Sequence, residues 1–341
     1  MPIHNFAPLD GRIEHFVIKS KALANNMLGD PHERTVAVYL PPGYDSDNSR
    51  YPLLVDLAGF TGSALKHTAW KAFGESIPQR IDRLVRAGAM GPVICAFPDC
   101  FTSLGGNQYV DSVAMGMWEE YLTVELIGAL ESKYQLLEGA AHRACFGKSS
   151  GGYGALIHGL KHADTWGAVA CHSGDVAFDL AYRGDMAATM TQVAKHGSFQ
   201  GFLHHFEEAR DVNGREMHAL MILAMAATYD PDPRSYKGIR LPVDPRTCEL
   251  DPERWQAWLA HDPLVLLENP SYQANLAKLR GLFIDCGSRD QYHLHYGSRA
   301  FTDRLRELGI EHRYEEFEDN HSGIDYRMDV SFPYLYAAIS E

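Results

Sequence analysis

The sequence lacks both a membrane-spanning segment and an excess of basic residues. No apolar run in its 341 residues approaches the roughly 20 residues of a transmembrane helix. Residues 1–12 lack the basic segment and apolar run of a secretory signal, which disfavours export. Lys and Arg number 31 against 44 Asp and Glu, and the resulting net charge of −13 argues against nucleic acid or an anionic membrane as a partner. We therefore expect a cytoplasmic protein.

Cysteine is also scarce, and its spacing carries no metal or redox motif. The six cysteines stand at positions 95, 100, 145, 171, 248 and 286, and no two form a C-x-x-C pair. This spacing does not indicate a zinc ribbon or a thioredoxin-like site. Cys95, Cys145, Cys171 and Cys286 fall in or beside apolar runs, so we expect buried, reduced thiols. Internal repeats and low-complexity tracts are absent as well.

What the sequence does contain is an alternation of short apolar runs with helical periodicity. Apolar runs typical of strands alternate with segments whose apolar residues recur at three- and four-residue steps. Strands are expected at residues 13–19, 34–40, 51–57, 91–98, 168–172, 282–286 and 312–317, and helices at 70–87, 115–134, 151–162, 296–308 and 326–339. This order predicts an α/β fold with a mostly parallel sheet covered on both faces. The opening strands are expected to add an antiparallel edge.

One long segment interrupts this alternation. Residues 175–277 hold no clear buried strand, and they combine helical pieces with a polar, Pro-rich stretch at 230–252 and an apolar helix at 217–227. We interpret them as a helical, cap-like insertion into a core formed by residues 1–174 and 278–341. Met221 and the neighbouring methionines either line an apolar acyl pocket or form the insertion's own core or a homo-oligomer contact.

Ser149 lies in the most informative motif of the chain. Gly147 and Gly151 flank it in the G-x-S-x-G pattern, after a short apolar run and before a helical segment. This context is typical of a nucleophile elbow, in which a sharp strand–turn–helix connection presents a serine hydroxyl. Gly147-Lys148-Ser149 also resembles the end of a phosphate-binding loop. That loop requires a glycine five residues before Gly147, and His142 stands there instead.

An acid and a base follow the serine in the order that an elbow-type hydrolase requires. Asp290 follows the expected strand at 282–286, and His321 follows the one at 312–317. We predict that His321 accepts the serine proton and that Asp290 orients His321. In the alternative interpretations Asp290 caps the next helix and His321 is an ordinary loop residue; Asp285 and Asp319 are lesser candidates for the acid.

The remaining site predictions concern the oxyanion and the pocket. The amides of Ser150 and Phe60, with Gly59 as a hinge, are the expected donors to the oxyanion, although residues 58–62 also suit a simple turn. His172 ends the strand after the elbow, and with Ser173 and Asp175 it is a candidate either for lining the substrate pocket or for loop capping and turn formation. His293 and His295 alone lack a third metal ligand, so neither a metal nor a cofactor is expected.

These motifs together resemble the esterase D / putative esterase family of α/β-hydrolases. The resemblance rests on Pro41-Pro42-Gly43-Tyr44 after a strand, on residues 51–59, on 118–134, on the elbow at 147–156, and on the positions of Asp290 and His321. It covers roughly residues 10–175 and 278–341. The family includes S-formylglutathione hydrolases, feruloyl esterases, enterochelin esterases and secreted mycolyltransferases.

The resemblance implies an α/β-hydrolase fold and a serine hydrolase that cleaves small-molecule carboxylic esters through an acyl-enzyme. An acyltransferase with the same triad, or a catalytically silent binding protein of this fold, are the alternatives. The sequence departs from the family at Ala58 and Lys148, where histidine is common, and in the length of the insertion. These departures concern the substrate and not the fold.

Overall fold

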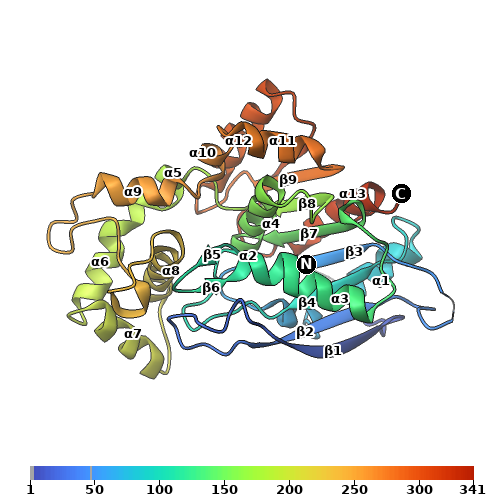
Figure 1. Cartoon of the computed structure of the whole chain (residues 1–341), viewed down its shortest axis with the longest axis horizontal. Helices are drawn as coiled ribbons and strands as arrows, with labels where there is room; N and C mark the ends of the chain where they lie inside the picture. The colour runs from blue at the N-terminus through green and yellow to red at the C-terminus, as the bar shows by residue number, and fades with distance from the viewer. Residues whose placement is uncertain (1–3, 47) are drawn as a thin grey trace.

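The computed structural model describes residues 4–46 and 48–341, and within them one large sheet organises the molecule (Figure 1). Its eight strands have the order β1-β2-β4-β3-β7-β8-β9-β10. The pairs β1–β2 and β2–β4 are antiparallel, whereas all pairs from β4 to β10 are parallel. The strands are β1 (Arg12–Lys19), β2 (Glu33–Leu40), β3 (Leu53–Leu57), β4 (Ile94–Pro98), β7 (Arg143–Lys148), β8 (Ala168–His172), β9 (Gly281–Gly287) and β10 (Arg313–Phe317). The predicted parallel sheet with an antiparallel edge is thus confirmed.

The burial of the strands follows from their place in this order. Every residue of the central strands β3, β4, β8 and β9 is buried, as expected for strands covered by helices on both faces. The edge strands β1 and β10 leave several of their side chains exposed or half-buried. All six cysteines are free thiols, and five of them are buried, including Cys95, Cys145, Cys171 and Cys286.

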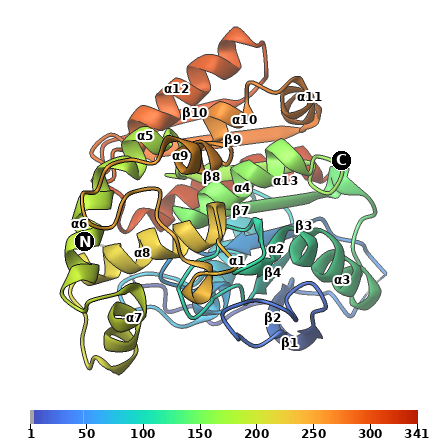
Figure 2. The same ribbon diagram turned by 60° about the vertical axis from the view of Figure 1, so that its left-hand side comes forward.

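Helices cover both faces of the sheet, as Figures 1 and 2 show. On one face α1 (Ile77–Arg86) and α13 (Met328–Ile339) pack against the strands, with the ring of Phe332 in an edge contact with Phe146 at 4.8 Å. The other face holds α2 (Trp118–Glu120), a π-helical turn (Tyr121–Leu126), α3 (Ile127–Lys133), α4 (Ser150–Lys161) and α12 (Leu294–Glu307).

The first predicted helix is shorter than expected. It begins at Ile77 and not near Trp70, because Ser76 and Gln79 form a reciprocal capping box that fixes the first turn. Phe73 upstream has a positive φ of 52°, which no helical residue adopts. Residues 70–76 are therefore an irregular segment, with the Trp70 ring 72% exposed.

Helix α4 is anchored by a buried histidine. The Nε2 of His158 lies 3.1 Å from the carbonyl of Tyr109, and its Nδ1 accepts a hydrogen bond of 3.0 Å from the indole of Trp166. These partners suit a neutral ring, and burial lowers the pKa of His158 to about 3. The hydroxyl of Tyr109 in turn donates to the carbonyl of Ala58 at 2.6 Å. The anchor thus connects α4 to the loop that follows β3.

The segment between β8 and β9 is helical, as predicted from its lack of apolar strand runs. It contains α5 (Phe178–Ala181), α6 (Met186–Ala194), α7 (Phe199–Glu208), α8 (Gly214–Tyr229), α9 (Pro252–Leu259), α10 (Pro263–Leu266) and α11 (Pro270–Lys278). Helices α6 to α8 project to one side, whereas α10 and α11 pack on α12 and α4 of the core (Figure 2). No helix in the described residues is long and apolar enough to cross a membrane.

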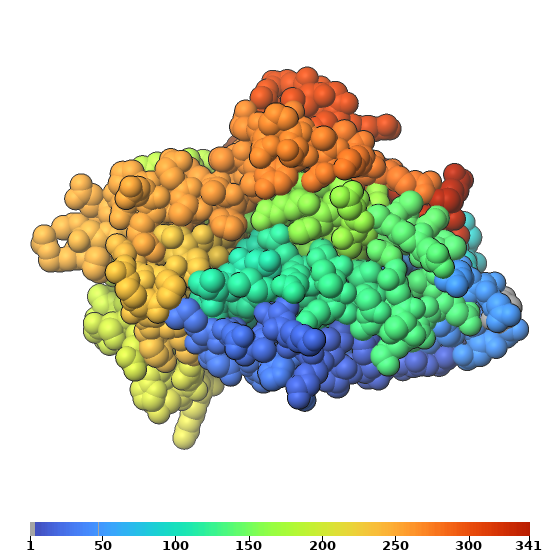
Figure 3. Space-filling model, in the orientation of Figure 1, coloured from blue at the N-terminus to red at the C-terminus, as the bar shows by residue number. Residues whose placement is uncertain are grey.

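The insertion and the sheet share one apolar core. A continuous cluster of buried side chains extends from Leu156 and Val169 to Phe202, Leu220 and Trp258 of the insertion. In the space-filling view the insertion, coloured yellow and orange, lies directly against the green part of the core (Figure 3). The boundaries predicted at 174/175 and 277/278 thus separate segments of the sequence, while the packing is continuous across them.

Candidate active site

Ser149 lies at the apex of the turn between β7 and α4. Its backbone has a φ of 58° and a ψ of −124°, a sparsely populated conformation that marks a strained turn. A Cβ added to Gly147 or Gly151 would lie 2.3 or 1.8 Å from the carbonyl oxygen of Leu57. Both positions therefore require glycine, which explains why the motif predicted this turn from sequence.

Asp290 and His321 meet in the loops after β9 and β10. The Nδ1 of His321 lies 2.7 Å from Oδ2 of Asp290, and Oδ1 of Asp290 accepts a bond of 2.8 Å from the amide of Tyr292. The Asp290 side chain is fully buried, and that of His321 is 11% exposed. The following helix begins at Leu294 with His293 at its N-cap, so Asp290 is not that cap.

One cavity brings Ser149 and His321 together. It has a volume of about 430 Å³ and lies at the carboxyl edge of the sheet, where ligands collect in open α/β folds. Asp290 lies behind His321, away from the cavity surface. The cavity is lined by residues of the core loops and of the insertion, including Gly59, Phe60, Lys148, Ser149, Asp175, Tyr182, Met217, His218, Met221, Tyr292, His321 and Ser322.

The three residues expected at the oxyanion surround the serine. Gly59 and Phe60 line the cavity, and a Cβ on Gly59 would lie 3.3 Å from the carbonyl oxygen of Lys148 and 3.7 Å from the Cβ of Ser149. The loop after β3 therefore lies directly against the elbow. Ser150 is the first residue of α4, where unpaired amides and the helix dipole favour negative charge.

Sequence reasoning missed what holds this loop. A Cβ on Gly105 would lie 2.6 Å from the Phe60 ring, and one on Gly106 would lie 3.0 Å from the Cα of Phe60. The paired glycines therefore let the segment after β4 pack against the loop after β3. The sequence Gly105-Gly106 was a signal for such a close approach.

His172 is not in the cavity, which corrects its predicted role in lining the substrate pocket. Its ring is buried, with Nδ1 2.7 Å from Oδ1 of Asp285 and Nε2 2.9 Å from the hydroxyl of Ser331 on α13. Successive strand residues face opposite sides of a sheet, and His172 pairs in register with Asp285 on the side of α13. Position at a strand end alone could not distinguish the two directions.

Met221 and Asp175 do line the cavity. Met221 lies on α8, one turn after Met217, so the insertion supplies an apolar wall. Burial raises the pKa of Asp175, although its Oδ2 accepts hydrogen bonds from Tyr182 at 2.8 Å and Gln108 at 2.9 Å. The cavity therefore has an apolar side and a carboxylate already occupied by two internal donors.

Lys148, beside the serine, points to a carboxylate on the other side of the elbow. Its Nζ lies 3.2 Å from Oδ1 of Asp325, whose other oxygen pairs with Lys71. Burial opposes ionisation of Asp325, but the charges of Lys148 and Lys71 outweigh it and lower its pKa. The lysine is therefore one of three neighbouring charges, with Asp325 and Lys71.

The cavity is separate from the metal-ligand cluster found in the described residues. His196, His205 and Glu216 of the insertion offer ligand atoms within 4.8 Å of one another. None of the three lines the cavity. His293 and His295, the pair weighed from sequence, are not part of this cluster.

Comparisons with known proteins agree with this architecture. The profile of a family described as Putative esterase matches residues 29–330. A solved ferulic acid esterase is 18% identical with a TM-score of 0.62, over 97% of this chain and 100% of that one. The S-formylglutathione hydrolase of Agrobacterium tumefaciens is 18% identical with a TM-score of 0.59, over 98% of each chain. The fluorophosphonate-binding serine hydrolase F of Staphylococcus aureus is 14% identical with a TM-score of 0.58, over 96% and 98%. The fold is that of the α/β-hydrolases.

Proposed function

Because the chain belongs to the Putative esterase family and is a carboxylesterase-type hydrolase, we propose that Ser149, His321 and Asp290 form its catalytic triad. The observation that supports this assignment is the buried His321–Asp290 pair at 2.7 Å, whose histidine lines the same cavity as the strained serine. A base whose Nδ1 donates to a carboxylate presents Nε2 as a proton acceptor.

The reaction follows from these positions. Ser149 Oγ attacks the carbonyl carbon of the ester while His321 Nε2 takes the hydroxyl proton. The amides of Ser150 and Phe60 donate hydrogen bonds to the oxyanion. The carbon–oxygen bond to the alcohol then breaks, and His321 protonates the departing oxygen. Water then attacks the acyl carbon and gives a proton to His321, which passes it to Oγ of Ser149 as the bond between that oxygen and the acyl carbon breaks and the acid is released.

The cavity walls support a division of the substrate. Met217 and Met221 provide flexible apolar surface, which suits the acyl group of a small ester. The carbonyl carbon lies at Ser149, next to the loop that carries Phe60. The alcohol then leaves on the side where His321 protonates it.

The triad is tested by replacing Ser149 with alanine. Turnover of 4-nitrophenyl acetate in Ser149→Ala should fall by about 10⁴-fold or more, since no nucleophile replaces the hydroxyl. A fluorophosphonate probe should label the wild type and not this variant. Ser322→Ala is the matched control, because Ser322 lines the same cavity and should keep nearly full turnover. Full activity in Ser149→Ala would contradict the assignment.

A further inference from the structure

A second cavity lies on the other side of the oxyanion loop. It has a volume of about 420 Å³ and shares Gly59, Thr61 and Lys148 with the catalytic cavity. The ester carbonyl is held at this loop in the proposed mechanism. The two cavities are therefore placed to receive the two halves of one ester.

Basic side chains dominate the lining of this second cavity. Lys66, Lys71, Arg80 and Lys148 face two carboxylates, Glu75 and Asp325, and His67 also lines it. The chain as a whole carries a net charge of −13. The net charge of this cavity lining is therefore positive, opposite in sign to that of the whole chain.

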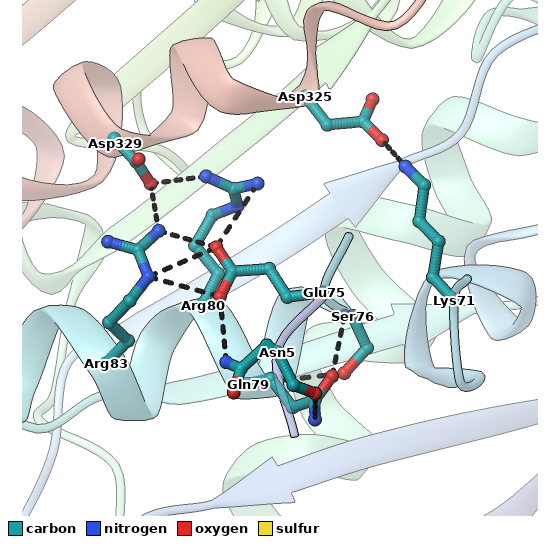
Figure 4. A network of polar contacts seen from close by, with 9 residues as sticks. All are labelled: Asn5, Lys71, Glu75, Ser76, Gln79, Arg80, Arg83, Asp325 and Asp329. Atoms are coloured by element: carbon teal, nitrogen blue, oxygen red, sulfur yellow. Dashed lines mark hydrogen bonds and ion pairs between the residues drawn. The ribbon is translucent and has the colours of Figure 1, made fainter. Parts of the chain in front are cut away.

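Part of this charge is neutralised within the wall. Figure 4 shows Arg80 and Arg83 between Glu75 and Asp329, a group of two cations and two anions. This group fixes the wall geometry and adds no net charge. Arg80 and Arg83 each pair with both of these carboxylates, so their charges are already balanced within the wall.

Lysines supply the charge that remains. Lys71 and Lys148 share the single carboxylate of Asp325, which leaves one positive charge in excess (Figure 4 shows Lys71 with Asp325). Lys66 is exposed and has no carboxylate partner within ion-pair distance in the described part of the chain. Two positive charges thus remain without a counter-ion.

His67 adds a donor to the same wall. Its Nδ1 lies 2.5 Å from Oδ2 of Asp56, a fully buried carboxylate at the end of β3. The charge of Asp56 raises the pKa of His67 despite burial of the ring. This contact at Nδ1 holds the imidazole in place in the cavity wall.

We propose that this second cavity binds an anionic group carried by the alcohol half of the ester, with Lys66, Lys71 and Lys148 as the cationic contacts. This proposal rests on the proposed function. The acyl half occupies the catalytic cavity. Among the residues that the structure describes, Lys148 is the one lysine that lines the catalytic cavity, where it is joined by the methionine wall and the carboxylate of Asp175, whereas three lysines line the second cavity. The charged half is therefore assigned to the second cavity. Carboxylate and phosphate groups share this chemistry.

The edge of the second cavity suggests a suitable probe. Trp70 lines it, and the ring is 72% exposed with His4 tilted against it at 5.0 Å. An exposed aromatic ring offers a stacking surface to an aromatic alcohol. Phenolic esters with a charged group on the ring therefore test the proposal directly.

The experiment compares 4-acetoxybenzoate with 4-acetoxybenzamide, which differ in charge and little in shape. We expect kcat/KM of the wild type to favour the anionic ester by about tenfold, and we expect the Lys66→Glu variant to abolish this preference, a change worth about 1.4 kcal/mol. Lys278→Glu is the matched control, since Lys278 is 57% exposed on α11 and lines neither cavity. Taking the ratio of the two esters within each variant cancels general losses of activity.

Ionic strength provides a second readout on the unmodified enzyme. The preference should fall several-fold between about 0.02 and 0.5 M salt, because screening shortens the reach of the lysine charges. A preference that is absent, or that is equal in the wild type and Lys66→Glu, would overturn the proposal. 4-Acetoxyphenyl phosphate is the third ester, and a larger preference for it than for the benzoate identifies phosphate as the group bound.

Binding of the product separates this proposal from the proposed function. 4-Hydroxybenzoate should raise the melting temperature of Ser149→Ala more than 4-hydroxybenzamide does, and Lys66→Glu in that background should remove the difference. If neither ester is hydrolysed by the wild type but this difference is present, the mechanism fails and the anion site stands. Equal shifts with both phenols would refute the anion site alone.

Discussion

Replacing Asp290 with asparagine isolates the role of a single buried carboxylate. Both of its oxygens have a donor in the structure: the amide of Tyr292 at 2.8 Å and Nδ1 of His321 at 2.7 Å. An asparagine has only one oxygen and can satisfy one of them. With its NH₂ toward the Tyr292 amide, two buried donors would face each other, at a cost of about 1–3 kcal/mol.

The variant should therefore turn its NH₂ toward His321. The imidazole must then accept at Nδ1 and carry its proton on Nε2, where it can no longer take one from Ser149. The loss of the tautomer and of the charge that stabilises the imidazolium together predict a fall in kcat of about 10⁴-fold, or about 5.4 kcal/mol. Because the side chains are isosteric, the free energy of unfolding should change by less than about 2 kcal/mol.

Steady-state kinetics with 4-nitrophenyl acetate measures this directly, with urea unfolding as the control for structure. The neighbouring Asp319→Asn serves as a matched variant, since Asp319 is a half-buried loop residue outside the His321–Asp290 pair, and it should retain nearly full activity. A kcat for Asp290→Asn within tenfold of the wild type would refute the reasoning. The same loss in Asp319→Asn would show that the carboxylate had been misidentified.

Three other predictions concern the helix after the elbow and the insertion. The pKa of His158 is lowered to about 3 in the folded protein. Below pH 6.5 the unfolded chain therefore binds a proton at this residue that the folded chain does not bind. The free energy of unfolding should fall by up to about 1.4 kcal/mol per pH unit as the pH drops from about 6.5 toward about 3. In His158→Gln the loss between pH 6.5 and 5 should be smaller by about 2 kcal/mol, measured by urea unfolding at each pH, and an equal loss would contradict a buried neutral ring. Gly151→Ala should lower the free energy of unfolding by about 4 kcal/mol or prevent folding, because the added Cβ would overlap the carbonyl of Leu57. Gly128→Ala, on an open helix surface, is the control and should be neutral or stabilising. Similar melting temperatures for the two variants would disprove the overlap. Met221→Trp should lower kcat/KM for 4-nitrophenyl hexanoate relative to the acetate by about tenfold, and an unchanged ratio would remove α8 from the acyl pocket.

The sequence predicts most of the fold because the relevant signals are local. Apolar runs with intervening helical periodicity are properties of short windows, and the glycines beside Ser149 report a steric need inside one turn. The order of Asp290 and His321 follows from the strands that they end, since parallel strands bring their carboxyl ends to one edge. Their hydrogen bond is thus consistent with a prediction from order alone.

Features that depend on side-chain direction or on distant partners were not predictable in this way. His172 was expected at the pocket because it ends a strand, but the pleat turns it toward α13. The pair formed by Asp56 and His67 and the contact of Lys148 with Asp325 join segments whose spacing carries no periodicity. The start of α1 depends on the capping box at Ser76, which the apolar pattern of residues 70–87 obscures.

The core shared by the insertion and the sheet determines how a substrate reaches Ser149. A cap joined to the rest by a hinge can swing away as a rigid body, but here such a movement would pull Phe202, Leu220 and Trp258 out of a continuous apolar interior. Exposing that surface would carry the free-energy cost of partial unfolding. We therefore expect substrate to enter through the mouth of the cavity itself, without a movement of the insertion as a whole. Substrate selection in this enzyme should then depend on the side chains that line the cavity and not on domain closure.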